Sequence, residues 1–358
     1  MSVLHEVFNL GQSAWLDYIS RDLIASGGLA DWISKGVVGV TTNPSIFEGA
    51  IAKTTDYDSE VKSLAKEGKN SSEIYEVLTL QEVGAAADIL KPVYDKTNGL
   101  DGYVSLEVSP LLASDRDTTV SEAKRLFKIL NRPNVMIKIP ATPEGISALE
   151  ECIASGVNVN STLIFSEEQY AQVAEAYVKG IKARAAKGLD LKVASVASVF
   201  VSRVDSAVDK LLTEKGKTDL CGKIATDSIK LTYERFKKIF SGSEWDSFVS
   251  KGAKVQRPLW ASTGTKNKAY SDVKYVDDLI APNTVNTIPP ATMSAFLDHG
   301  KAALTLEKDL DGAKARMKEL ESAGNDLKAV CAKLLADGVE AFNGAFRSLM
   351  SAIENKAK

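Results

Sequence analysis

Cysteine and histidine are scarce in this chain of 358 residues. Its three cysteines, Cys152, Cys221 and Cys331, are far apart and lack C-x-x-C spacing, so neither a disulfide framework nor a zinc site is expected. We interpret them as small core residues. Only two histidines are present, His5 near a terminus and His299 in a helix-like stretch near the end, and surface or packing roles are preferred for both, so neither a serine triad nor a histidine metal site is indicated. The sequence therefore predicts no metal centre.

An excess of one charge and long apolar runs are lacking as well. The formal net charge is −3, with both signs interspersed, so no basic stripe is present to bind nucleic acid. The longest apolar runs have the length of strands, and residues 1–9 lack a basic stretch followed by an apolar one. We therefore expect neither nucleic acid nor a membrane as a partner, and a cytoplasmic enzyme is the default expectation.

The most informative residue is Lys138, which lies in the apolar, β-branched run Asn134–Pro140. An amine buried between Ile137 and Ile139 loses hydration, which favours its neutral form and makes it a candidate Schiff-base nucleophile. The alternative is a strand lysine that faces solvent at a sheet edge, and this strand alone leaves both interpretations open.

Other strand-like segments also place polar side chains on one face, near the end of the strand. Successive strand residues point to opposite faces, so polar residues two apart share a face. The segments and their polar residues are Ser13–Asp17 with Asp17, Val37–Asn43 with Thr41 and Asn43, Tyr103–Val108 with Glu107, and Val157–Thr162 with Asn158, Asn160 and Thr162.

Helical patterns separate these strands. A proline-and-acid start at Pro44 opens a stretch with helical spacing to about Tyr94, and further helices are predicted from Thr118 and Thr142. Strands are also predicted at 193–198, 254–261 and 278–281. About eight strands alternating with helices predict a (β/α)8 TIM barrel, whose catalytic groups come from the carboxyl ends of different strands.

A doubly wound open sheet is the alternative fold. It would normally carry a glycine-rich phosphate loop after an early strand, and neither G-x-G-x-x-G nor G-x-x-x-x-G-K-[ST] occurs in the sequence. The absence of linkers and repeats predicts a single domain over residues 1–358. From about residue 301 to 358 the pattern becomes charged and helical, which predicts extra helices that pack on the barrel, and the end of such a helix could cover the site mouth.

These residues suggest a chemistry. A lysine amine that attacks a ketone forms an iminium, which accepts electrons when the neighbouring carbon–carbon bond breaks. Glu107 is the candidate acid and base, through a water held by the hydroxyl of Thr162. Asp17 is the candidate for the proton of the substrate hydroxyl, although a cap or turn carboxylate is the competing interpretation.

Four segments resemble transaldolases. Val38–Phe47 and Val135–Thr142 look like the two signature segments of this family, and Asn160–Ser166 and Ser198–Asp205 resemble further family segments. The region Leu259–Asn267 looks more like the longer bacterial and plastid-type branch. The matches run from Asp17 to at least Pro289.

The resemblance implies a class I aldolase-type barrel without metal or cofactor. It implies transfer of a dihydroxyacetone unit from sedoheptulose 7-phosphate or fructose 6-phosphate to glyceraldehyde 3-phosphate or erythrose 4-phosphate in the pentose phosphate pathway. The residues carried over are Lys138 for the Schiff base, Glu107 and Thr162 for a catalytic water, Asp17 for the substrate hydroxyl, Thr41, Asn43 and Asn160 for the dihydroxyacetone portion, and Ser198, Arg203 and Lys266 for phosphate.

Three of these assignments carry alternatives. Lys266 appears where the shorter branch has an arginine, so it would be a point charge rather than a fork. Arg203 could instead pair outward with Asp205. Phe200, whose counterpart helps decide whether the enamine intermediate meets an aldehyde or water, could be a core aromatic.

Two rival functions remain at this stage. A class I aldolase that releases free dihydroxyacetone or its phosphate would use the same lysine, and a catalytically silent metabolite-binding barrel would keep only the fold. Small sugar phosphates are the expected partners. The sequence leaves open whether the chain is a monomer or a homodimer.

Overall fold

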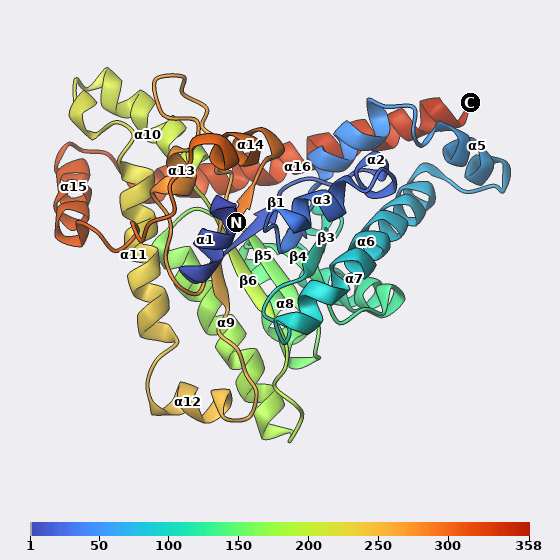
Figure 1. Ribbon diagram of the computed structural model, residues 1–358, viewed down its shortest axis with the longest axis horizontal. Coiled ribbons are helices and arrows are strands. Elements are labelled where there is room, and N and C mark those ends of the chain that lie inside the picture. Colours follow the sequence, from blue (N-terminus) through green and yellow to red (C-terminus); the bar gives the residue numbers. More distant parts are fainter. Residues whose placement is uncertain (1) are drawn as a thin grey trace.

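Eight parallel strands close into a barrel over residues 2–358, which the computed structural model describes (Figure 1). Each strand pairs with the next one along the chain, and β8 pairs with β1. The predicted (β/α)8 barrel is thereby confirmed. The strands are β1 (Gln12–Leu16), β2 (Gly39–Thr41), β3 (Tyr103–Glu107), β4 (Val135–Pro140), β5 (Val159–Ile164), β6 (Ser195–Phe200), β7 (Arg257–Ala261) and β8 (Thr284–Ile288).

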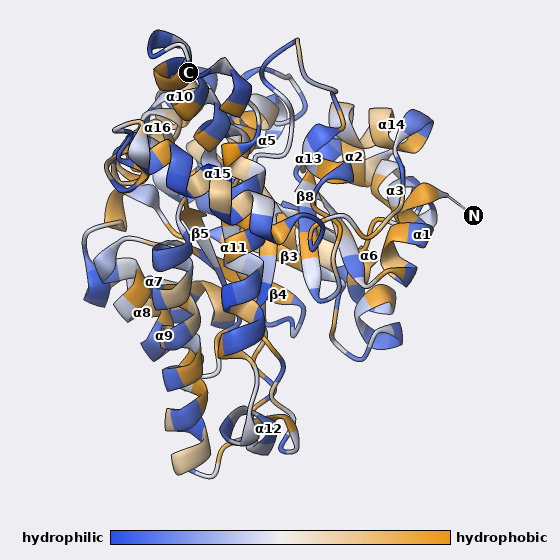
Figure 2. Ribbon diagram, turned by 90° about the vertical axis from the view of Figure 1, so that its left-hand side faces the viewer, coloured by the Kyte–Doolittle hydropathy of each residue, from blue (hydrophilic) through white to orange (hydrophobic). Residues whose placement is uncertain are grey.

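Helices surround this barrel, and hydrophilic and hydrophobic residues alternate along them (Figure 2). They are α1 (Val3–Asn9), α2 (Arg21–Ala25), α3 (Gly28–Ser34), α4 (Pro44–Phe47), the π-helix η1 (Glu48–Ala52), α5 (Asp58–Lys66), α6 (Ser71–Lys96), the 3-10 helix η2 (Pro110–Leu112), α7 (Arg116–Leu130), α8 (Pro143–Ala154), α9 (Glu167–Ala186), α10 (Ser202–Glu214), the 3-10 helix η3 (Thr218–Leu220), α11 (Ile224–Ile239), α12 (Ser243–Val249), α13 (Lys274–Asp277), α14 (Pro290–His299), α15 (Leu310–Ser322) and α16 (Leu327–Ala357).

Every residue of β4 is buried, because helices cover the outer face of the barrel and side chains fill its interior. Val135, Ile137 and Ile139 share one face of this strand, and Met136 and Lys138 share the other. The helix predicted after β4 begins at Pro143, with Thr142 as its N-cap accepting a hydrogen bond from the backbone N–H of Gly145.

The strand predicted at 278–281 is wrong. The last strand is β8, which begins at Thr284. The backbone of Ile280 bonds to Thr305 instead of a neighbouring strand, accepting from its N–H and donating to its hydroxyl. Pro282 and Asn283 then separate this buried apolar segment from the barrel, and the backbone of Asn283 has a φ of 57°.

The stretch predicted to be helical, from Pro44 to about Tyr94, is divided into several helices. The segment is helical but forms α4, η1, α5 and α6 in turn. Gly68, with φ of 87°, ends the helix before it, and Asn70 starts α6 through a capping box with Glu73. Spacing of apolar residues does not reveal such breaks, because each piece keeps the same helical period.

The helix α16, red in Figure 1, crosses one end of the barrel and contacts α4, η1, α6, α10 and β5. This end is the one at which the strands terminate. Within residues 2–358, no helix has the length and apolar character needed to cross a membrane. The single domain over 1–358 stays a prediction.

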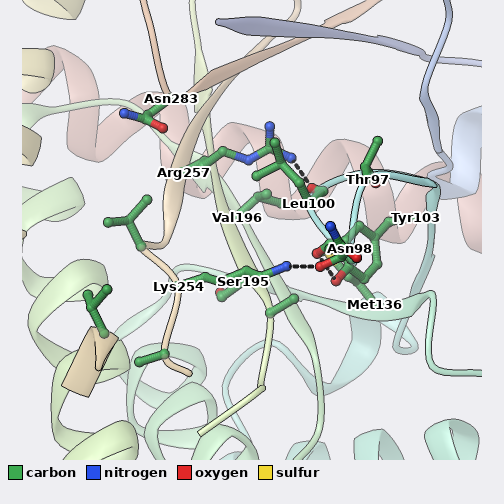
Figure 3. Close-up of a pocket in the computed structure, with 15 residues that line it drawn as sticks. Thr97, Asn98, Leu100, Tyr103, Met136, Ser195, Val196, Lys254, Arg257 and Asn283 are labelled. Atoms are coloured by element: carbon green, nitrogen blue, oxygen red, sulfur yellow. Dashed lines mark hydrogen bonds between the residues drawn. The ribbon is translucent and has the colours of Figure 1, made fainter. Parts of the chain in front are cut away.

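The opposite end of the barrel is held by a buried ion pair. Arg257, at the start of β7, donates to Asp101, to the carbonyl of Leu100 and to the hydroxyl of Ser13. Figure 3 shows Arg257 beside a cavity of about 390 Å³ that opens at this amino end. Catalytic groups of such barrels lie at the other end, so we assign the Arg257 network to stability.

Candidate active site

A cavity of about 160 Å³ opens at the carboxyl ends of the strands. Most of the site residues expected from the sequence line it, although they come from six different strands and the segments that follow them. These lining residues are Asp17, Thr41, Asn43, Lys138, Thr162, Ser198, Phe200, Arg203 and Lys266. Glu107 and Asn160 are also buried and contact members of this set from below. The structure therefore brings the expected residues together, while their roles stay predictions.

Lys138 points into the barrel and not to solvent. Its residue is 4% exposed, so the alternative of a solvent-facing edge lysine is wrong. Its Nζ donates to the backbone carbonyl of Thr42 at 3.0 Å and lies 3.4 Å from a carboxylate oxygen of Glu107. The ring centroid of Phe342 lies 5.8 Å from the same nitrogen. The amine is thus held by one carbonyl, one carboxylate and one aromatic face, with its remaining side open to the cavity.

Glu107 is a buried acid beside Lys138. Burial raises its pKa to about 7, although the nearby Lys138 amine opposes this shift. Among the described residues, neither carboxylate oxygen has a hydrogen-bond partner of good geometry, and the hydroxyl of Thr162 has none either. Buried polar atoms normally have partners, so an ordered water or a ligand is the expected partner of these groups.

Asp17 follows β1 and accepts a hydrogen bond from Thr41 Oγ1 at 2.7 Å. Thr287 Oγ1 lies 2.5 Å from the same Thr41 oxygen. The single hydroxyl proton of Thr41 goes to Asp17, so Thr287 must donate to Thr41. Burial raises the pKa of Asp17, and Lys138, the Thr41 bond and Lys266 oppose that shift. This carboxylate bonds across strands, so the cap or turn interpretation is wrong.

Asn160 and Ser198 form a second network, on β5 and β6. Ser198 Oγ donates to Asn160 Oδ1 at 2.7 Å, and Asn160 Nδ2 donates to Ser105 Oγ at 3.0 Å. The side chain of Asn43 caps α4 by accepting a hydrogen bond from the N–H of Ile46. The same residue also lines the cavity. These amides are therefore fixed in orientation before any ligand binds.

Two cations, Arg203 and Lys266, line the cavity from separate elements. The guanidinium carbon of Arg203 lies 5.2 Å from the ring centroid of Phe200, and burial lowers the pKa of this arginine. Asp205 does not pair with it but accepts hydrogen bonds from Ala225 and Tyr275. The outward Arg203–Asp205 pair is therefore wrong. Phe200 lines the cavity and also packs on Phe165, with ring centroids 5.3 Å apart.

Several lining residues were not expected from the sequence. Ser45, Ser262 and Thr287 follow or end strands, so the strand-end rule could have found them. Phe342 comes from α16, and no motif in the sequence indicates it. Across residues 2–358, no group of three or more His, Cys, Asp or Glu side chains is placed to hold a metal ion.

Residues 14–353 match the family described as Transaldolase/Fructose-6-phosphate aldolase. The chain belongs to this family. The resemblance seen in the sequence is thereby confirmed, and the barrel and the buried lysine have a family context.

Bacterial relatives match over nearly the whole chain. A transaldolase of Trichodesmium erythraeum is 46% identical, covering 99% of this chain and 97% of the relative. Transaldolase 2 of Nostoc punctiforme is 44% identical over 100% and 99%, and a transaldolase of Thiobacillus denitrificans is 44% identical over 99% and 100%. Such coverage leaves no large part of either chain without a counterpart.

Proposed function

We propose that this enzyme is a transaldolase that moves a dihydroxyacetone unit from a ketose phosphate to an aldose phosphate. Sedoheptulose 7-phosphate or fructose 6-phosphate would be the donor, and glyceraldehyde 3-phosphate or erythrose 4-phosphate the acceptor. The observation that carries the proposal is the Lys138 amine, buried beside Glu107 and open to a cavity that Arg203 and Lys266 also line. Family membership and the relatives named transaldolase support it.

The covalent step begins at Lys138. Its deprotonated amine attacks the ketone carbon of the donor, and the carbinolamine loses water after a proton reaches the departing oxygen. Glu107 supplies that proton through a water held with Thr162, since a pKa of about 7 lets its carboxyl group give and take protons near neutrality.

Carbon–carbon cleavage then falls to Asp17. Its carboxylate removes the proton from the donor hydroxyl next to the bond that breaks, and the bond electrons move into the iminium to leave an enamine on Lys138. The aldose departs, the enamine carbon attacks the acceptor aldehyde, and Asp17 returns the proton to the new hydroxyl. Hydrolysis of the iminium releases the product ketose and restores the amine.

The remaining residues bind the sugar phosphate. Thr41, Asn43 and Asn160 offer hydroxyl and amide groups to the dihydroxyacetone portion, next to Lys138. Arg203 and Lys266 bind the phosphate, with a hydroxyl from Ser198 nearby, because a guanidinium forms paired hydrogen bonds to its oxygens and an ammonium adds a point charge.

Borohydride trapping tests the lysine assignment. Wild-type protein treated with fructose 6-phosphate and borohydride is expected to carry a reduced three-carbon adduct on Lys138, located by peptide mass spectrometry. Lys138→Ala should lose both the adduct and activity. Lys266→Ala is the matched control, because it removes the other lysine of the cavity and should keep the adduct at saturating donor. Unchanged labelling of Lys138→Ala would falsify the assignment.

Product analysis separates transfer from the rival aldolase activity. A transaldolase should lose steady turnover when the acceptor aldehyde is omitted, because the enamine then stays on Lys138. Steady release of free dihydroxyacetone or its phosphate without an acceptor would favour the aldolase instead.

A further inference from the structure

Two carboxylates outside the cavity, Asp205 and Asp209, lie one turn apart on α10. This helix begins directly after β6, and its first turn carries Arg203. Each carboxylate accepts one hydrogen bond from a tyrosine hydroxyl. Tyr275 donates to Asp205 at 2.7 Å, and Tyr270 donates to Asp209 at 2.7 Å.

The same carboxylates also accept backbone N–H groups from the start of α11 and the residues before it. Ala225 N–H donates to Asp205 at 2.8 Å, and Gly222 N–H donates to Asp209 at 2.8 Å. The second oxygen of each carboxylate is therefore fixed, so the acceptors offered to the tyrosines have a defined direction.

Both tyrosines belong to the segment between β7 and β8 that carries Lys266. Residues 262–273 of this segment contain neither strand nor helix, and Lys266 itself is exposed. Before Lys266 the segment is anchored by Ser262, whose carbonyl accepts from the N–H of Ser202 on α10, and by Thr263, whose hydroxyl donates to the carbonyl of Thr287. After Lys266 come the bond from Thr265 Oγ1 to the carbonyl of Ser271 and the exposed pair of Asp272 and His299. Exposed pairs of this kind contribute little, so the tyrosine bonds are the ones that tie the part of the segment after Lys266 to α10.

Asp205 is buried at a cost. Its side chain is 1% exposed and makes no ion pair with a cation among the described residues, and burial raises its pKa to about 6. An apolar residue at this position would leave the Tyr275 hydroxyl and the Ala225 N–H without their acceptor, so the carboxylate ties both segments to α10.

We propose that Asp205 and Asp209 are positioning residues that act through Tyr275 and Tyr270. They hold the segment with Lys266 against the helix with Arg203, so that both cations reach one phosphate group from two sides of the cavity. This inference rests on the proposed function. It adds that phosphate recognition depends on hydrogen bonds outside the cavity, since a flexible lysine on a loop without regular structure would otherwise lose much of its binding free energy to ordering.

The test compares a phosphorylated with an unphosphorylated acceptor. Tyr270→Phe keeps the ring and removes only the bond to Asp209. It should raise KM for glyceraldehyde 3-phosphate about tenfold, because a hydrogen bond to a charged group contributes roughly 1.5 kcal/mol or more. The kcat with this acceptor, and kcat/KM for unphosphorylated glyceraldehyde, should change far less. Asp209→Asn should show the same pattern.

Two further variants sharpen this test. Tyr103→Phe is the matched control, because it removes a tyrosine bond to the Gly99 carbonyl at the amino end of the barrel, outside the Lys266 segment, and should leave both acceptors unaffected. The double variant Tyr270→Phe, Asp209→Asn should match the single ones, since both changes break one bond.

The outcomes distinguish this inference from the proposed function. Equal losses with both acceptors, or no loss with either, in Tyr270→Phe would overturn the positioning role. Failure of the wild-type protein to form the borohydride adduct would instead overturn the proposed function. If Asp209→Asn fails to fold, Tyr270→Phe still decides, because its ring packing is preserved.

Discussion

Replacing Glu107 by glutamine should stabilise the protein at neutral and alkaline pH while it abolishes most activity. The wild-type carboxyl group has a pKa of about 7 in the folded protein against an ordinary value of 4.5, because burial disfavours its charged form. A folded-state pKa above the unfolded one means that the folded protein binds the proton more tightly. The unfavourable contribution of the Glu107 carboxyl group to the stability of the folded protein is therefore absent below pH 4.5 and fully present above pH 7.

The size of this effect follows from the pKa difference. A shift from 4.5 to about 7 corresponds to about 3 kcal/mol of stability lost between those pH values. Glutamine does not titrate, so the stability of Glu107→Gln relative to wild type should grow by this amount as pH rises. For a chain of 358 residues, whose unfolding entropy is roughly 0.75 kcal/mol per kelvin, the Tm difference would change by about 4 °C.

Thermal melting of both proteins at intervals from pH 4.5 to pH 7.5 measures the effect, where the lower limit is the ordinary pKa of the group. Glu175→Gln is the matched control, because Glu175 is exposed and its replacement should give a difference of less than about 0.5 kcal/mol at every pH. A Tm difference between Glu107→Gln and wild type that stays constant over the range would refute the reasoning. The loss of activity, roughly a hundredfold or more, is measured in the same preparations.

Three further predictions concern the cavity. Thr162→Val should lower kcat by about 100-fold, through loss of the water that it holds with Glu107, without lowering Tm, since the hydroxyl has no partner among the described residues. A retained kcat would remove Thr162 from proton transfer. Phe342→Ala should destabilise the protein by about 3 kcal/mol and increase release of dihydroxyacetone relative to transfer, because water gains access to Lys138; an unchanged product ratio would contradict this. Strong chelators should leave turnover unchanged, and a loss restored by added metal would show the expectation to be mistaken.

The fold could be predicted from the sequence where side-chain period and strand ends agree. Lys138 illustrates this, because its β-branched neighbours and its inward position follow from one alternating run. The eighth strand could not be located, since Leu279 and Ile280 form a buried apolar run whose backbone bonds to Thr305, a residue distant in sequence. Tertiary bonding, rather than local pattern, decided between the two segments.

The residues of the candidate site could likewise be predicted only in part from the sequence. Asp17, Glu107 and Thr162 lie where the strand faces predict them. Phe342 could not be found, because an aromatic at helical spacing in α16 looks like any core residue until its helix is seen crossing the barrel. Tyr270 was missed for a related reason, as its partner Asp209 lies 61 residues away in the chain.

The crossing of the barrel mouth by α16 has a consequence for biosynthesis. The walls of the cavity are gathered from Asp17 to Phe342, so a nascent chain that has already closed its barrel still lacks one wall until that last helix docks. The cavity is therefore complete only once nearly the whole chain has been synthesised. The Lys138 amine meets its aromatic neighbour only after translation has passed that phenylalanine.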